Sequence, residues 1–223
     1  MAGASYKKQD RSRISFISGY QVMCNETGAD ETMSSIDSFV RLIVDSCHRI
    51  VKARIIDERL VRRVIINDAK NRGYKVADED DVRKVLWPIG PFMDVVIEID
   101  NELHAAELKV IRKEALFGLS LNGWEQTLLY TLNGIDYAWL VQYYVKGGLL
   151  FLRSGQFNAY TLIRKTLNIY GIQHIGLLAL DLSAQGQCNL AVQIRPVRSF
   201  QGYRQDPFLN QRRNLIKSIL RHC

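Results

Sequence analysis

The chain has no apolar run long enough to cross a membrane. A membrane-spanning helix needs roughly 18–20 consecutive apolar residues, and no apolar stretch of this sequence approaches that length. The amino-terminal stretch MAGASYKKQDRSR also lacks the apolar core of a secretion signal. These two absences predict a cytoplasmic, intracellular protein that has no membrane partner.

Cysteine is scarce and scattered. The four cysteines are Cys24, Cys47, Cys188 and Cys223, and no two of them form a Cys-x-x-Cys pair. Structural zinc sites and redox motifs usually bring cysteines together at such short spacing. We therefore expect reduced thiols in an intracellular setting, with neither a structural zinc ion nor a framework of disulfides.

Two familiar catalytic signatures are also missing. The sequence contains no Gly-x-x-x-x-Gly-Lys loop, so an ATP-driven motor is not expected. No local motif supports a serine or cysteine catalytic triad either. The chemistry of this chain must therefore be sought in other residue patterns.

Positive charge, by contrast, is present in surplus. The chain has 30 Lys and Arg residues against 23 Asp and Glu residues, which gives a formal net charge of +7. This balance favours a polyanionic partner such as nucleic acid. The apolar fraction of 47% is that of an ordinary folded protein, and 223 residues are enough to bury a real core.

The chain divides into a short basic segment and one larger domain. Residues 1–31 mix lysines and arginines with small polar residues, so they predict either a partly ordered basic arm or a solvated terminus. Residues 32–223 alternate helical and strand-like patterns. We expect them to form a single α/β domain, with a mixed central β-sheet flanked by helices and a helix at the carboxyl end.

Periodicity and capping residues locate the expected elements. Helices are predicted from Ser34 or Ser35 to Val51, from an N-cap at Asp57 to Gly73, over 78–87, from a capping box at Asn122 and Glu125 to Gly134, over 159–170, and after Asp206-Pro207. Strands are predicted over 92–99, 103–111, 135–145, 149–153, 175–182 and 188–197. In the last helix the arginines are expected on the side opposite the apolar stripe.

A predicted β-hairpin carries the most informative pattern. Strands over 92–99 and 103–111 fit a two-residue turn at Asp100-Asn101. Because side chains alternate along a strand, this register puts Asp94 opposite Glu107 and Lys109 on the same face. A turn shifted by one residue would pair Asp94 with Lys109 instead, and the three side chains would still share a face.

Such a group of charges suits a hydrolytic metal site. Two adjacent carboxylates repel each other unless a cation lies between them, and their oxygens suit Mg²⁺ or Mn²⁺. Ordinary ion pairs on a solvated hairpin face are the alternative interpretation. The apolar residues on either side of Glu107 and Lys109 favour a buried strand, in which charges are rarely retained without a function.

Pro91-x-x-Asp94, followed by Glu107-x-Lys109 on the next strand, resembles the signature of the PD-(D/E)XK nuclease superfamily, although that family usually has the proline and aspartate adjacent. The resemblance implies a restriction-endonuclease-like core and a Mg²⁺- or Mn²⁺-dependent deoxyribonuclease that hydrolyses phosphodiester bonds. It implies that Asp94, Glu107 and the backbone carbonyl of Leu108 hold the metal ion. Lys109 would orient the attacking water or stabilise the pentavalent phosphorus.

Two branches of the superfamily are candidates. Glu58-Arg59 at a helix start resembles the archaeal Holliday-junction resolvases, which implies a fourth metal ligand at Glu58 and a homodimeric endonuclease acting in DNA recombination or repair. Without that role, Glu58 would simply favour the helix dipole. His48 competes with Glu58 for the place of the upstream metal ligand, because RecB-like nucleases use a histidine there.

Gln126 and Tyr130 carry the second resemblance. They are four residues apart on a predicted helix and share a face. Gln-x-x-x-Tyr after the Glu-x-Lys motif is similar to RecB-like exonucleases, in which it helps to position the lysine and the DNA backbone. Otherwise Tyr130 would pack in the core and Gln126 would be incidental. The dispersed cysteines argue against the members of that branch that carry an iron–sulfur cluster.

A different class of function remains open. The chain could be a non-catalytic nucleic-acid-binding module that retains the fold. The intact set of Asp94, Glu107 and Lys109 counts against this alternative, because a lapsed site is free to lose any of them. In every case the expected partner is DNA, whether duplex, branched or single-stranded.

Overall fold

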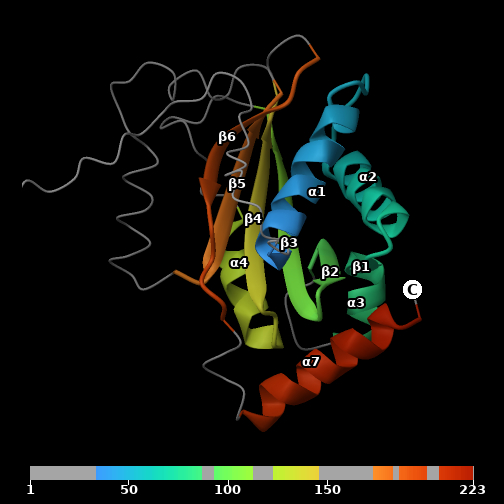
Figure 1. Ribbon diagram of the computed structural model, residues 1–223, viewed down its shortest axis with the longest axis vertical. Helices are drawn as coiled ribbons and strands as arrows, with labels where there is room; N and C mark the ends of the chain where they lie inside the picture. The colour runs from blue at the N-terminus through green and yellow to red at the C-terminus, as the bar shows by residue number, and fades with distance from the viewer. Residues whose placement is uncertain are drawn as a thin grey trace, which may run out of the picture. The chain divides into compact units, whose positions relative to one another are not determined.

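A six-stranded mixed β-sheet forms the centre of the computed structural model (Figure 1). The structure describes residues 34–86, 93–112, 123–145, 173–182, 186–199 and 206–222, all of them within the compact unit Met33–Cys223. The strands follow the order β1-β2-β3-β4-β5-β6 across the sheet. They are β1 (Lys75–Asp78), β2 (Val95–Ile99), β3 (Glu102–Ile111), β4 (Tyr137–Tyr144), β5 (Ile175–Asp181) and β6 (Asn189–Ile194).

Both strand directions occur in this sheet. The first three strands pair antiparallel, β3, β4 and β5 run parallel, and β6 returns antiparallel. The expected α/β class with a mixed central sheet flanked by helices is thereby confirmed. The four-residue β1 was not expected from the sequence, because its pattern is too short to show a period of two.

The β2–β3 hairpin has the register expected from its turn. Val95 pairs with Ala106 and Ile99 with Glu102, which leaves a two-residue turn at Asp100 and Asn101. Both turn residues have a positive φ, 51° and 64°. Asn and Asp tolerate this left-handed conformation better than other residues with a side chain, and the tight turn requires it at both positions. The hairpin geometry therefore follows from local sequence.

Helices cover both faces of the sheet. They are α1 (Ser35–Ile50), α2 (Glu58–Asn71), α3 (Glu79–Leu86), α4 (Trp124–Tyr130), the 3₁₀ helix η1 (Thr131–Asn133) and α7 (Pro207–Leu220). One face of the sheet packs its apolar side chains against α1 and α2, and the other packs against α3, α4 and α7 (Figure 1). Glu107 and Lys109 alternate with the buried Ala106 and Leu108 of the first face, so they belong to the second.

The helix ends mostly match the predicted caps. Asp57 accepts a hydrogen bond from the backbone N–H of Leu60, and Asp206 caps α7 in the same way. The expected capping box at Asn122 is wrong. The N-cap of α4 is Gly123, whose φ of 95° allows the chain to enter the helix without a side-chain cap.

Helix α7 contradicts the expected division into an apolar and a basic side. Of the expected apolar stripe, Leu209, Ile216, Ile219 and Leu220 are buried, whereas Leu215 is 37% exposed. Arg212, expected on the opposite side, is only 6% exposed. Its guanidinium donates to Asn133 at 2.5 Å, and neighbouring Arg213 forms an ion pair with Asp136. Both arginines point inward because their guanidinium groups bind the buried oxygen acceptors of Asn133 and Asp136. The periodicity of the helix cannot predict these contacts, because the acceptors lie outside the helix.

The expectation of free thiols is also wrong. Cys47 of α1 and Cys188, just before β6, form a disulfide although 141 residues separate them in the chain. Both are buried, with 0% and 2% exposure. Sequence spacing could not reveal this pair, because the packing of α1 against the sheet brings the two cysteines together.

Several expectations lie outside the described residues. They are the basic arm over 1–31, the strand over 149–153, the helix over 159–170 and the role of Pro91. Within the described ranges, no helix combines the length and the apolar character that crossing a bilayer requires.

Candidate active site

The structure brings Asp94, Glu107 and Lys109 together at the β2–β3 hairpin. Asp94 immediately precedes β2, and the register that pairs Val95 with Ala106 places it beside Glu107. The two acidic residues are buried, with only 8% and 2% of their surface exposed. Burying two neighbouring carboxylates is costly unless cations and hydrogen-bond donors surround them.

Glu107 receives two such donors. The ammonium of Lys109 lies 2.5 Å from Glu107 Oε1, and the hydroxyl of Tyr130 donates to Oε2. Tyr130 comes from α4 and is fully buried. A helix that follows β3 in the chain thus orients the strand's carboxylate, and the carboxylate in turn holds the lysine.

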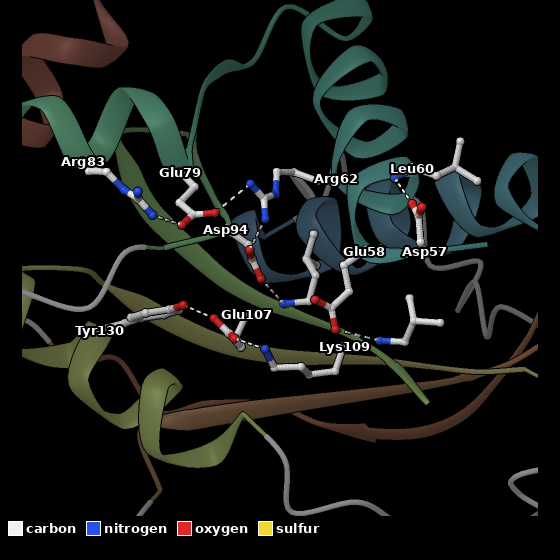
Figure 2. Close-up of polar contacts among 12 residues, drawn as sticks. Asp57, Glu58, Leu60, Arg62, Glu79, Arg83, Asp94, Glu107, Lys109 and Tyr130 are labelled. Atoms are coloured by element: carbon white, nitrogen blue, oxygen red, sulfur yellow. Dashed lines mark hydrogen bonds and ion pairs between the residues drawn. The ribbon is translucent and has the colours of Figure 1, made fainter. Parts of the chain in front are cut away.

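Asp94 is bound by a residue that the sequence analysis missed. Arg62 Nη2 lies 2.7 Å from Asp94 Oδ1, and the backbone N–H of Leu108 donates to Oδ2 at 2.8 Å. Arg62 also reaches Glu79 at 2.8 Å, and Glu79 pairs with Arg83 at 2.6 Å. Figure 2 shows these side chains as a continuous polar chain that ends at Asp94.

A sequence signal for Arg62 did exist. It follows Glu58 by four residues on α2, so both side chains lie on the same side of that helix. Helix α2 was already expected to supply a site residue through Glu58. A basic residue one turn further along was therefore a candidate for the same site.

Glu58 lies at the edge of the candidate site. Its Oε1 accepts from the backbone N–H of Val110 at 3.4 Å, one residue beyond Lys109 (Figure 2). Its negative charge also contributes to raising the pKa of Lys109. The side chain is thus close enough to act on the lysine electrostatically.

The other two candidates lie apart from these charges. Gln126 is exposed on α4, whereas Tyr130 on the same helix is buried against Glu107. His48 is exposed on α1, which packs against the opposite face of the sheet. Of the Gln-x-x-x-Tyr pair, the structure thus brings only the tyrosine to the site.

The electrostatics of the site show an excess of negative charge. Burial, with a further contribution from the charge of Glu107, raises the pKa of Asp94 to about 6, although Leu108 N–H, Arg62 and Lys109 act in the opposite direction. Burial lowers the pKa of Lys109, but its hydrogen bond to Glu107 and the nearby negative charges outweigh that effect, and its pKa is raised. The lysine is therefore held as an ammonium ion.

Gly123 allows α4 to approach this site closely. A Cβ atom on Gly123 would lie 2.7 Å from Leu140 Cδ1, 3.2 Å from Glu107 Cγ and 3.3 Å from Lys109 Cε. Any side chain at this position would therefore displace the stems of the two charged residues. Glycine also suits the positive φ of 95° at this N-cap.

The donor set fits a Mg²⁺ ion that keeps part of its water shell. Among the described residues, no group of three or more His, Cys, Asp and Glu side chains is close enough to hold a metal. Mg²⁺ is usually bound through one or two carboxylates, with waters and substrate oxygens completing the shell. Asp94 and Glu107 supply two buried carboxylates, and both now rest against cationic groups.

Comparison with known proteins adds little to this geometry. No protein-family model matches the chain, and no curated protein matches it. The chain is similar to the solved structure of Pyrococcus furiosus SfsA in complex with Ca²⁺, at 14% sequence identity and a TM-score of 0.30. The alignment covers 64% of this chain and 66% of that one, which is just under two thirds of its length.

Proposed function

We propose that this protein is a metal-dependent deoxyribonuclease of the PD-(D/E)XK type, with a restriction-endonuclease-like core. The observation that carries the proposal is the buried pair of carboxylates, Asp94 and Glu107, with the ammonium of Lys109 at 2.5 Å from the second. A buried site with this excess of negative charge favours a divalent cation. The chain's net charge of +7 supports a polyanionic substrate.

In the proposed mechanism, Asp94, Glu107 and the carbonyl of Leu108 would hold Mg²⁺ or Mn²⁺. A bound metal ion lowers the pKa of a coordinated water and screens the charge of the phosphate. Lys109 contributes a positive charge and hydrogen-bond donors, because its raised pKa keeps it protonated at neutral pH. This supports stabilisation of the pentavalent phosphorus by Lys109 rather than removal of a proton from water.

Two substrate preferences remain candidates. The position of Glu58 beside the β3 strand supports a junction-resolving endonuclease, which would act as a homodimer in the cell interior. The hydrogen bond from Tyr130 to Glu107 supports a RecB-like exonuclease, although Gln126 is exposed. We favour the endonuclease, because Glu58 lies near Lys109 whereas only one residue of the RecB-like pair reaches the site.

The test is cleavage of four DNA substrates in Mg²⁺ and in EDTA: a closed four-way junction, closed circular duplex, linear duplex and linear single strand. Symmetric nicks near the junction, together with a dimer in sedimentation, would support the endonuclease. Degradation that requires a free end would support the RecB-like alternative. Binding without Mg²⁺-dependent cleavage of any substrate would overturn the proposed function.

A further inference from the structure

Arg62 occupies one oxygen of the carboxylate that the proposed metal ion needs. Its Nη2 lies 2.7 Å from Asp94 Oδ1, and Leu108 N–H already donates to Oδ2. Both oxygens of Asp94 therefore have a donor. A divalent cation that binds Asp94 through Oδ1 must compete with the guanidinium of Arg62 for the same atom.

The same guanidinium has a second acceptor. Arg62 Nη1 lies 2.8 Å from Glu79 Oε2, while Glu79 Oε1 pairs with Arg83 at 2.6 Å (Figure 2). Within the described part of the chain, Arg62 Nε is buried and has no hydrogen-bond partner. Arg62 is thus held through its two terminal nitrogens, and release from Asp94 would leave it bound to Glu79.

Resting on the proposed function, we propose that Arg62 is a latch on the metal site. Arg62 holds Asp94 Oδ1 in this structure, and it would give up this contact when a divalent cation binds. Glu79 keeps the guanidinium beside the site and competes with Asp94 for its charge. Arg62 is therefore a positioning residue that sets the affinity of the site for the cation. Glu79 sets the strength of the contact between Arg62 and Asp94.

The latch predicts opposite effects from two neighbouring substitutions. Arg62→Ala removes the competing cation, so Mn²⁺ should bind about tenfold more tightly or better, within the range by which neighbouring partners change metal affinity. Glu79→Gln removes the competing ion pair of Arg62, so the guanidinium should bind Asp94 more strongly. Mn²⁺ should then bind roughly several-fold more weakly. In the double variant, the effect of Glu79→Gln should disappear, because no latch remains for Glu79 to hold.

The experiment is a titration of the full chain with Mn²⁺ in the absence of DNA, with free Mn²⁺ followed by electron paramagnetic resonance. Arg63→Ala is the matched control, because Arg63 is exposed on the same helix and its loss removes the same charge. We expect its Mn²⁺ affinity to stay within about twofold of that of the unmodified chain. Thermal melting in EDTA reports whether each variant is folded.

The outcomes separate the latch from the proposed function. If the unmodified chain binds Mn²⁺ and Arg62→Ala binds it no more tightly, the latch is wrong and the metal site stands. The latch is also wrong if Glu79→Gln weakens Mn²⁺ binding equally with and without Arg62. The loss of the negative charge of Glu79 would then explain the weaker binding without any role for Arg62. If Arg62→Ala does not fold, unchanged or tighter binding by Glu79→Gln overturns the latch. Absence of Mn²⁺ binding in every folded form overturns both proposals.

Discussion

Two buried acidic clusters of this protein differ in how completely their charges are balanced. In the first, Asp136 accepts from Arg198 Nε at 3.0 Å, from Arg213 Nη2 at 2.6 Å and from the backbone N–H of Leu103 at 2.8 Å. Arg198 also reaches Glu102 at 3.0 Å. Two arginines therefore face two carboxylates, and Asp136 has a donor at each oxygen.

The candidate active site is arranged differently. There, Asp94, Glu107 and nearby Glu58 share the positive charges of Lys109 and Arg62, and Arg62 is itself divided between Asp94 and Glu79. Acidic groups therefore outnumber the cationic ones, and burial together with the charge of Glu107 raises the pKa of Asp94 to about 6.

We propose that the difference separates a cluster that holds the fold together from one that binds a divalent cation. The Asp136 cluster connects the start of β3, the start of β4, the segment after β6 and helix α7, and its charges are already matched. In the hairpin cluster, by contrast, the carboxylates outnumber the cationic side chains that they share, and this imbalance supports the proposed binding of an added cation. The following predictions test this distinction, beginning with the largest effect.

Loss of activity at the hairpin cluster should be the largest effect. Asp94→Asn, Glu107→Gln and Lys109→Ala should each reduce Mg²⁺-dependent DNA cleavage by about 10²–10³-fold or more, because each removes a charge that acts on the metal ion or the phosphate. Cleavage assays and circular dichroism measure activity and fold together. Near-full activity in any two of these folded variants would refute the assignment of the site.

Substitution in the Asp136 cluster should lower the stability of the fold. Asp136→Ala leaves Arg198 and Arg213 without their buried partner, and breaking a buried ion pair costs about 3–5 kcal/mol of unfolding free energy. Urea denaturation provides the measurement. A variant as stable as the unmodified chain would show that these charges do not hold the elements together, and the comparison of the two clusters would fail.

Gly123 links the candidate active site to the packing of α4. Gly123→Ala introduces both a strained φ of 95° and a close contact with Leu140, Glu107 and Lys109, so we expect a loss of about 1–3 kcal/mol together with reduced cleavage. Gly73→Ala is the matched control. Its φ is 76°, but a Cβ there would meet nothing within 4 Å, so it should cost only the backbone strain and leave cleavage unchanged. Equal losses of stability and activity in both variants would contradict the close approach of α4.

Asp94 should make a smaller contribution to the free energy of unfolding, and this contribution should depend on pH. Its pKa rises from 3.8 in the unfolded chain to about 6 in the folded one, so the folded protein binds the proton more tightly. The contribution of Asp94 therefore favours folding below pH 4 and is lost as the pH rises through about 6, at most about 3 kcal/mol.

Asp94→Asn should remove this slope when melting is measured in EDTA. Buried His104 acts with the opposite sign, because burial lowers its pKa to about 3 and its contribution is lost as the pH falls from 6.5 towards 3. The difference between the unmodified chain and Asp94→Asn isolates the aspartate. A difference that stays constant between pH 4 and 7 would contradict the raised pKa of Asp94 in the folded protein.

The sequence by itself determined the hairpin and the shared face of its charges. Side chains alternate along a strand, and Asp100-Asn101 favours a two-residue turn, so the pairing of Asp94 with Glu107 follows from local geometry. The same is true of α1, α2 and α7, whose caps and apolar periodicity are local properties of the backbone.

Only the tertiary structure decided which distant groups meet. The contact of Arg62 with Asp94, the hydrogen bond of Tyr130 to Glu107 and the Cys47–Cys188 disulfide join residues that are 23 to 141 positions apart. No local period encodes such pairs, because they depend on how the helices pack against the sheet. The inward arginines of α7 have the same cause, because Arg213 turns towards the buried carboxylate of Asp136 and Arg212 towards the buried amide oxygen of Asn133, and neither acceptor belongs to α7.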